Sequence, residues 1–321
     1  MVSLENKIIC IVGPTASGKS DLAQEIALAL NGEIVSADSM QIYREMDIGT
    51  GKVIESQQRV KHYGIDLVDP GVPYSAALYQ EYARRALEKI DAGGKRALLV
   101  GGTGLYVRAA LDDYSFPRGD NECNPVRERY TAFAEEHGAQ ALWDLLHERD
   151  PDSAREIHPN NVRRVVRAFE LIEEGESYAR QKARLQSIPQ FYPAVFIGMK
   201  VAPEVLRSRI DRRVDAMVAH GLIEEVTRLL DKGFRQGLTA AQAIGYKEIV
   251  SALDGARSMD QAIEDIKTAS RRYAKRQRTW FGKDRRINWI DAELPMGQML
   301  ARSLDIIERA DRASESVSCV S

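Results

Sequence analysis

Hydrophobic positions alternate between two spacings over the first 114 residues. Short apolar runs rich in β-branched residues, KIICIV at 7–12 and RALLVGG at 96–102, predict buried strands, and GEIVSAD at 32–38 predicts another. Residues 20–32 and 75–94 instead place apolar side chains at helical spacing and end in glycine, which predicts helices. Alternation of strand and helix is typical of a parallel sheet with crossover helices.

The spacing changes in the middle of the chain. No strand pattern occurs from about 115 to 190, where three successive stretches have the spacing of amphipathic helices: 125–138, 139–150 and 161–177. This block predicts a helical insertion.

Strand patterns return after the insertion. AVFIGMKV at 194–201 and RINWID at 286–291 read as strands, and between them Ser258 and Gln261 predict a capping box for a helix that runs toward Phe281.

A glycine-rich turn joins the first strand to the first helix. Within CIVGPTASGKS, residues 10–20, the motif G-x-x-x-x-G-K-[ST] is complete. N–H groups at the start of the helix would surround phosphate oxygens, Lys19 would bridge two phosphates, and Ser20 would ligate Mg²⁺. The motif predicts a phosphate site, which a nucleotide or another diphosphate could fill. The expected loop comprises Gly13, Pro14, Thr15, Ala16, Ser17, Gly18, Lys19 and Ser20, with Ser20 as the metal ligand.

These patterns define a fold class. We predict an α/β protein with a phosphate-loop NTPase-like parallel sheet core flanked by helices, and an all-helical insertion domain. The core with its C-terminal helices would comprise 1–114 and 194–321, and the insertion 115–193.

Composition, net charge and cysteine content limit the class of protein to which the chain can belong. The chain has 321 residues, 44% of them hydrophobic, which is ample for a core, and its net charge of −2 gives no overall attraction for nucleic acid. Three cysteines without C-x-x-C spacing indicate neither a disulfide framework nor a zinc site. No apolar run is long enough to cross a membrane. We expect a cytoplasmic monomer.

Two strand ends offer candidate chemistry. Asp38 follows the strand EIVS, and ligands of open α/β sheets bind beyond the carboxyl ends of strands, so Asp38 could accept a proton there or merely cap a turn. After RALLV stand Gly101, Gly102 and Thr103, where an ATPase often places a magnesium-binding acid. The missing acid weakens an ATPase interpretation.

Basic residues cluster in three places. Arg209 and Arg213 are spaced i, i+4 and could share a helix face toward a diphosphate, or a solvated face. RRYAKRQRTWFGKDRR at 271–286 carries eight Lys or Arg residues interleaved with Tyr273, Trp280 and Phe281, a mixture that suits RNA, although aromatic residues at helical spacing are more often core. A further cluster comprises Arg163, Arg164 and Arg167.

Together the motifs closely resemble one family. GPTASGKS, SADSMQIYREMDIGTGK, HYGIDLVDP, VGGTGLY, IHPNNVRRVVRAFE, AIGYKE and AKRQRTWF are similar to segments of the bacterial tRNA dimethylallyltransferases, over most of the chain. The resemblance implies transfer of a dimethylallyl group from dimethylallyl diphosphate to the exocyclic amine of the adenosine 3′ of the anticodon, in tRNAs that read codons beginning with U. The loop would then bind an isoprenoid diphosphate with Mg²⁺, and ATP would not be consumed.

The resemblance also implies residue roles. Asp38 matches the general base, Thr15 a loop position that touches substrate, and Lys19 and Arg213 would stabilise charge on the leaving diphosphate. The insertion would grip the anticodon arm of tRNA. The implied tRNA-binding positions are Asp38, Ser39, Met40, Gln41, Thr103, Arg127, Asn161, Val162, Arg163, Arg164, Val165, Gln242, Ala243, Ile244, Gly245, Tyr246 and Lys247.

Other functions remain open on the residues alone. One is a phosphate-loop small-molecule kinase in which Asp38 activates a hydroxyl. Another is a nucleotide-switched RNA-binding module without catalysis, and a third is an adenylate prenyltransferase that acts on free AMP or ADP. The helical insertion and the AIGYKE segment favour tRNA over a free nucleotide.

Overall fold

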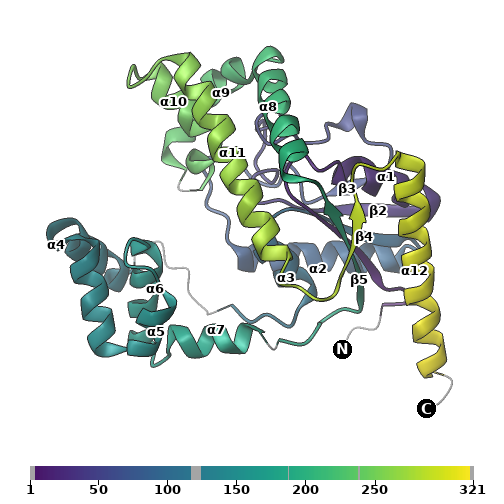
Figure 1. Cartoon of the computed structure of the whole chain (residues 1–321), viewed down its shortest axis with the longest axis horizontal. Coiled ribbons are helices and arrows are strands. Elements are labelled where there is room, and N and C mark those ends of the chain that lie inside the picture. The colour runs from purple at the N-terminus through teal and green to yellow at the C-terminus, as the bar shows by residue number, and fades with distance from the viewer. Residues whose placement is uncertain (1–3, 117–123, 187, 238, 319–321) are drawn as a thin grey trace. The chain divides into compact units, whose positions relative to one another are not determined.

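The chain divides into two compact units, of which the first comprises Met1–Asp112 and Gln190–Ser321. A six-stranded parallel sheet forms the centre of this first unit (Figure 1). The computed structural model describes residues 4–116, 124–186, 188–237 and 239–318. The strand order is β3-β2-β4-β1-β5-β6, and every pair is parallel, which confirms the predicted sheet. The strands are β1 (Ile8–Val12), β2 (Gly32–Ala37), β3 (His62–Tyr63), β4 (Arg96–Gly101), β5 (Ala194–Lys200) and β6 (Ile287–Asp291).

The strand β3 was not predicted from the sequence. It has two residues, and its pairing consists of Ile34 with His62 and Val35 with Tyr63. A strand this short, surrounded by turn residues, gives no hydrophobic periodicity to detect.

Side chains of the strands alternate between two cores. Ile8, Cys10 and Val12 of β1 pack on one face, which α2 (Ala76–Ala92) and α3 (Gly104–Leu111) cover. Ile9 and Ile11 pack on the other face, against α1 (Lys19–Ala29) and α12 (Met296–Ser318). Because helices cover both faces, β1 is wholly buried and reads as a continuous apolar run rather than an alternating one.

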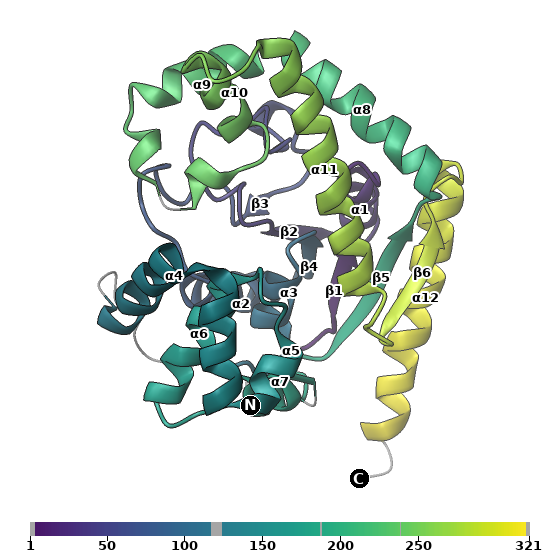
Figure 2. The ribbon, with the colours of Figure 1, turned by 60° about the vertical axis from the view of Figure 1, so that its left-hand side comes forward.

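A layer of helices extends beyond the carboxyl ends of β5 and β6 (Figure 2). It contains α8 (Pro203–Ala219), α9 (Leu222–Leu230), α10 (Tyr246–Leu253) and α11 (Met259–Phe281), with the short 3₁₀ turns η2 (Phe234–Gln236) and η3 (Ala240–Gln242). A third 3₁₀ turn, η1 (Glu55–Gln57), lies between β2 and β3.

At the start of α11, one of the two hydrogen bonds of the predicted capping box is present. The Ser258 side chain accepts a hydrogen bond from the Gln261 N–H, as expected of an N-cap. The Gln261 side chain donates to Asp265 on the next turn, where a full capping box would have it reach back to the cap.

The second unit is Asp113–Pro189, and its described residues, 113–116, 124–186 and 188–189, form four helices: α4 (Pro125–Arg149), α5 (Pro151–Glu156), α6 (Val162–Glu173) and α7 (Tyr178–Gln186). Gly138 has a φ of 87° and breaks α4, at the point where the sequence predicted one helix to end and another to begin. The unit has its own core, in which the Tyr130 and Phe169 rings stack 3.9 Å apart.

The division between the units differs by a few residues from the expected one. It falls after Asp112 and after Pro189, where the sequence placed it after 114 and after 193. Phe191 and Tyr192 belong to the first unit because their N–H groups both donate to the Leu111 carbonyl.

Two further features, the cysteines and the length of apolar segments, were also considered in the sequence. Cys10 is a free, buried cysteine, whereas Cys123 and Cys319 lie outside the described residues. Among the helices that the structure describes, none is long and apolar enough to cross a membrane.

Candidate active site

The phosphate loop connects β1 to α1 in a conformation that depends on glycine. Gly18 precedes α1 with a φ of 83°, a left-handed conformation that residues with a Cβ rarely adopt. At Gly13 an added Cβ would lie 2.9 Å from both the Met199 Cβ and the Ser17 hydroxyl oxygen. The loop therefore turns tightly against β5 before the helix begins.

Polar groups of this loop suit an anion. The Ser17 hydroxyl is buried and has no hydrogen-bond partner among the described residues. Among the described residues, no protein group accepts a hydrogen bond from the N–H groups of Gly18, Lys19 and Ser20. Buried polar groups are normally paired, and helix N-termini favour negative charge, so these donors fit phosphate oxygens.

Lys19, Asp38 and Arg213 form one electrostatic cluster. Burial lowers the pKa of Lys19 to about 8, with Asp38 opposing and Arg213 adding to that shift. Burial also lowers the pKa of Arg213, against the attraction of Asp38. The charge of Asp38 acts on both cations and that of Arg213 acts on Lys19, which places the three groups together near the carboxyl end of β2, as the sequence predicted for Asp38.

Asp38 both closes a turn and presents a carboxylate oxygen. Its Oδ1 accepts from the Met40 N–H at 2.9 Å, so the turn-capping interpretation of this residue is also realised. Its Oδ2 has no recorded partner among the described residues. The next residue is held by Thr103, whose Oγ1 accepts from the Ser39 N–H at 3.1 Å while its own N–H donates to the Ala37 carbonyl.

Arg213 and Arg209 do not act as a pair. The Arg213 Nη2 lies 3.4 Å from the Thr50 carbonyl oxygen, next to the cluster. The Arg209 Nη2 instead donates to the Ala292 carbonyl, just after β6. The hypothesis that both arginines face a diphosphate is therefore wrong for Arg209, because its guanidinium is bound to the end of another strand.

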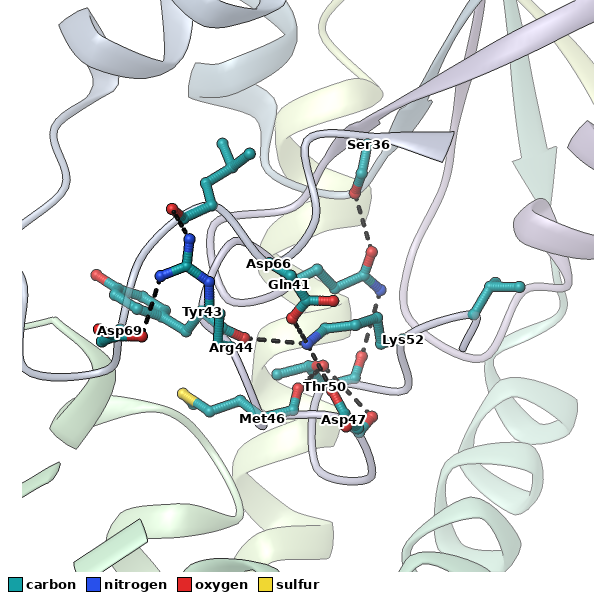
Figure 3. A network of polar contacts seen from close by, with 12 residues as sticks. Ser36, Gln41, Tyr43, Arg44, Met46, Asp47, Thr50, Lys52, Asp66 and Asp69 are labelled. Carbon is teal, nitrogen blue, oxygen red and sulfur yellow. Dashed lines mark hydrogen bonds and ion pairs between the residues drawn. The ribbon is translucent and has the colours of Figure 1, made fainter. Parts of the chain in front are cut away.

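A polar network holds the segment that follows Asp38 (Figure 3). The Gln41 side chain accepts from the Ser36 hydroxyl at 2.9 Å and reaches the Thr50 carbonyl at 3.5 Å. The Lys52 ammonium, whose side chain is 1% exposed, lies 2.6 Å from the carboxylates of both Asp47 and Asp66. A buried lysine with two acidic partners fixes the loop in one arrangement.

Gln277 is a site residue that the sequence did not single out. It lies on α11 and is 4% exposed; its Oε1 accepts from the Thr15 N–H at 2.9 Å, and its Nε2 donates to the Gly102 carbonyl at 3.0 Å. It therefore joins the phosphate loop to the end of β4. The signal was its spacing from Ala274 and Phe281, which places an uncharged polar residue on the buried face of a basic helix.

The basic segment 271–286 divides into core, paired and solvent-facing parts. Phe281 is 3% exposed, as the core interpretation predicted, whereas Trp280 is 44% exposed and its indole lies against Gly104. Arg271 pairs with Asp211, and Arg286 pairs with Asp112 and Asp284. The remaining basic residues have no acidic partner among the described residues: Arg272, Lys275, Arg276, Arg278, Lys283 and Arg285.

The segment 242–247 presents only some of its side chains to solvent. Gln242 and Lys247 are exposed and Ile244 is half-buried, whereas Ala243, Gly245 and Tyr246 are buried. The buried side chains support this segment, and contact with RNA stays a prediction for all of its members.

In the second unit, some of the predicted RNA-binding residues have partners within the unit. Arg127 lies 2.7 Å from Glu170, and Arg167 contacts both Glu170 and Glu174. Val165 is buried, and the Asn161 side chain caps α6 by accepting from the Arg164 N–H.

Arg163 and Arg164 complete the cluster on α6. Both are exposed, and neither has an acidic partner among the described residues. The cluster predicted at 163–167 is therefore reduced to these two solvent-facing cations, because Arg167 is neutralised by its glutamates.

Family comparisons match nearly the whole chain. A family described as IPP transferase matches residues 41–284, and one described as Isopentenyl transferase matches residues 6–64. The tRNA dimethylallyltransferase of Carboxydothermus hydrogenoformans is 46% identical over 294 residues, which cover 90% of this chain and 93% of that protein. The tRNA dimethylallyltransferase of Bacillus subtilis is 42% identical over 304 residues, which cover 94% and 96%.

Solved structures agree with these sequence matches. A tRNA delta(2)-isopentenylpyrophosphate transferase from Staphylococcus epidermidis has a TM-score of 0.70 and 38% identity, covering 95% of this chain and 99% of that one. A eukaryotic dimethylallyltransferase acting on tRNA has a TM-score of 0.74 and 28% identity, covering 90% of this chain and 74% of that one.

The role of Gln277 can be tested by truncation. Gln277→Ala should lower the free energy of unfolding by about 1–3 kcal/mol, because it leaves the Thr15 N–H and the Gly102 carbonyl without partners. It should also weaken binding of inorganic diphosphate with Mg²⁺. Urea unfolding and calorimetry measure the two effects. Gln261→Ala, on the exposed first turn of the same helix, is the control, and equal behaviour of both variants would contradict the assignment.

Proposed function

The chain belongs to the IPP transferase family of tRNA dimethylallyltransferases, and from this premise we propose how its site carries out the reaction. The chain is a prenyl transferase that acts on tRNA. We propose that the acceptor is the exocyclic amine of the adenosine 3′ of the anticodon, in tRNAs that read codons beginning with U, and that the donor is dimethylallyl diphosphate.

The observation that carries this proposal is the cluster of Lys19, Arg213 and Asp38. In the reaction, the bond between the allylic carbon and its oxygen breaks, and diphosphate leaves with the electron pair. Lys19, Arg213 and the N–H groups at the start of α1 supply positive charge where the leaving oxygens become more negative. The phosphate loop would thus bind the leaving group.

Asp38 supplies the group that the other half of the reaction needs. The amine nitrogen forms the new bond to carbon and must lose one proton. The Asp38 Oδ2 can accept that proton, while the Met40 N–H holds Oδ1 and so fixes the orientation of the carboxylate. The proton then passes to water when the product leaves.

The residues also fit a magnesium ion. Ser20 would ligate it, and the two phosphates would complete the oxygen set that Mg²⁺ prefers. The buried Ser17 hydroxyl and the N–H groups that begin α1 leave the loop rich in donors for those phosphates. When bound, the ion would neutralise part of the charge on the leaving diphosphate.

The end of β4 argues against a kinase or ATPase. A Cβ at Gly101 would lie 2.1 Å from the Ala37 carbonyl oxygen, and one at Gly102 would lie 2.1 Å from the Gln277 Nε2. Backbone leaves no room at Gly101 for the magnesium-binding acid of a typical phosphate-loop ATPase, and an acid at Gly102 would displace the Gln277 amide from the site. The packing of the site therefore favours a diphosphate donor that needs no such acid.

The acceptor can be tested directly. Labelled dimethylallyl diphosphate, incubated with the protein and Mg²⁺, should label unmodified tRNA and leave free AMP unlabelled. A tRNA with guanosine in place of the adenosine 3′ of the anticodon should stay unlabelled, which locates the acceptor. Labelling of AMP would indicate an adenylate prenyltransferase, and tRNA-stimulated ATP hydrolysis without transfer would contradict the proposed donor.

The role of Asp38 predicts a selective kinetic defect. Asp38→Ala should reduce turnover by about 10²–10⁴-fold, the usual effect of losing a general base, while diphosphate binding persists. Single-turnover transfer and calorimetry measure these quantities. Asp291→Ala is a matched control, because Asp291 is the last residue of β6 and accepts from an N–H two residues on, at 2.9 Å. Similar defects in both variants would reduce Asp38 to a turn residue.

The insertion should bind phosphates of the RNA backbone. Arg163→Ala with Arg164→Ala should weaken tRNA binding and reduce the slope of log affinity against log salt by roughly 0.7–0.9 for each phosphate that is no longer neutralised. The KM for dimethylallyl diphosphate should hardly change. Arg309→Ala with Arg312→Ala on α12 removes the same charge from arginines that have acidic partners. Titrations over a salt series compare the pairs, and equal slopes would place the RNA elsewhere.

A further inference from the structure

One buried carboxylate holds the loop that contains Thr50. Glu225, on the first turn of α9, is 2% exposed. Its Oε2 accepts from the N–H groups of Asp47 and Ile48 at 3.0 and 2.8 Å, and its Oε1 accepts from the Gly49 N–H at 3.2 Å. Three successive backbone donors therefore converge on a side chain that is remote in sequence.

A fourth donor fixes the orientation of this carboxylate. The Tyr246 hydroxyl donates to Glu225 Oε1 at 2.6 Å, and burial and the charge of Glu225 raise the pKa of this phenol, which keeps its proton. The Tyr246 ring packs so closely on Gly49 that a Cβ there would lie 2.4 Å from it. Glu225 has no cationic partner among the described residues, so neutral donors alone hold its charge.

The other end of the same loop supports Arg213. The Thr50 carbonyl accepts from the Arg213 Nη2, and a Cβ at Gly51 would lie 1.7 Å from that nitrogen. The guanidinium therefore rests directly on the backbone at Thr50 and Gly51. Any shift of this backbone would move the support on which Arg213 lies.

These contacts form a continuous connection from α9 to the candidate active site. We propose that Glu225 is a positioning residue: it fixes the backbone of residues 47–51 and, through the Thr50 carbonyl, the Arg213 guanidinium that faces the diphosphate. This role rests on the proposed function for its place in catalysis. Glu225 contacts the loop backbone and Tyr246 and acts only through Arg213.

The Lys52 network alone does not account for this positioning. Lys52 binds the side chains of Asp47 and Asp66 and the Tyr43 carbonyl, which restrain the two ends of the loop (Figure 3). The N–H groups of Ile48 and Gly49 depend on Glu225. The two restraints share only Asp47, whose N–H donates to Glu225 and whose carboxylate binds Lys52, so removal of the Glu225 carboxylate should loosen the loop while Lys52 stays in place.

The test is a double-mutant cycle with inorganic diphosphate and Mg²⁺ as the probe. Glu225→Gln puts an amide NH₂ against loop donors, so at least one N–H loses its acceptor. It should weaken diphosphate binding by about 10-fold to 100-fold, the range for losing a hydrogen bond to a charged group. In an Arg213→Ala background the same change should have little further effect, because Glu225 acts through Arg213.

Two other variants complete the design. Glu224→Gln, at the exposed neighbouring position on α9, should bind diphosphate as the wild type does. Tyr246→Phe removes one of the four donors and should weaken binding by a few-fold, again only where Arg213 is present. If Glu225→Gln does not fold, the cycle of Tyr246→Phe with Arg213→Ala decides the question by the same criterion.

The outcomes separate this role from general stabilisation. Wild-type affinity in a folded Glu225→Gln protein would overturn the proposal, as would an equal loss with and without Arg213. Transfer assays should show a matching fall in turnover. If the wild type transferred no dimethylallyl group to tRNA, the proposed function would fail, yet the diphosphate cycle would still decide the role of Glu225.

Discussion

Two half-buried cations beside a single carboxylate are the constraint on which this site depends. Burial lowers the pKa of both Lys19 and Arg213, and the positive charge of Arg213 lowers the pKa of Lys19 further. Asp38 opposes the effect on both. Like charges in a partly dehydrated site stay together only when rigid acceptors hold them, and carbonyls take that role here: Pro14 for Lys19 and Thr50 for Arg213. A bound diphosphate would complete the charge balance.

The need for rigid acceptors explains why several side chains of the first unit bind the loop of residues 47–51. Gln41 reaches the carbonyl of Thr50, Lys52 binds two carboxylates, and Glu225 collects three N–H groups. Gln41 and Glu225 hold backbone groups and Lys52 holds two side chains, and none of these contacts takes part in a proton transfer itself. A site that stabilises charge electrostatically needs its dipoles oriented before the reaction, because reorientation during the reaction would consume the gain.

Local patterns predicted the part of the site that is local. The strand, glycine turn and helix of the phosphate loop are contiguous, so their spacing determined both the fold class and the place of Lys19. Gln277 and Glu225 were not predicted because they bind partners 262 and 177 residues away in the chain, namely Thr15 and Ile48. Local sequence patterns do not indicate contacts at such separations. The prediction that Arg209 faces a diphosphate was wrong for a related reason. Helical spacing places Arg209 near Arg213, but its guanidinium binds the Ala292 carbonyl, just after β6.

The same reasoning applies to the basic clusters. Counting arginines in the sequence treats every one as available, yet Arg167 and Arg127 share a carboxylate that is 1% exposed, and Arg286 is held by two aspartates. A guanidinium already paired with a buried acid brings no net charge to a phosphate, and freeing it would leave that acid unpaired. Attraction for RNA must therefore come from cations without acidic partners, and a net charge of −2 does not describe how those few cations are distributed.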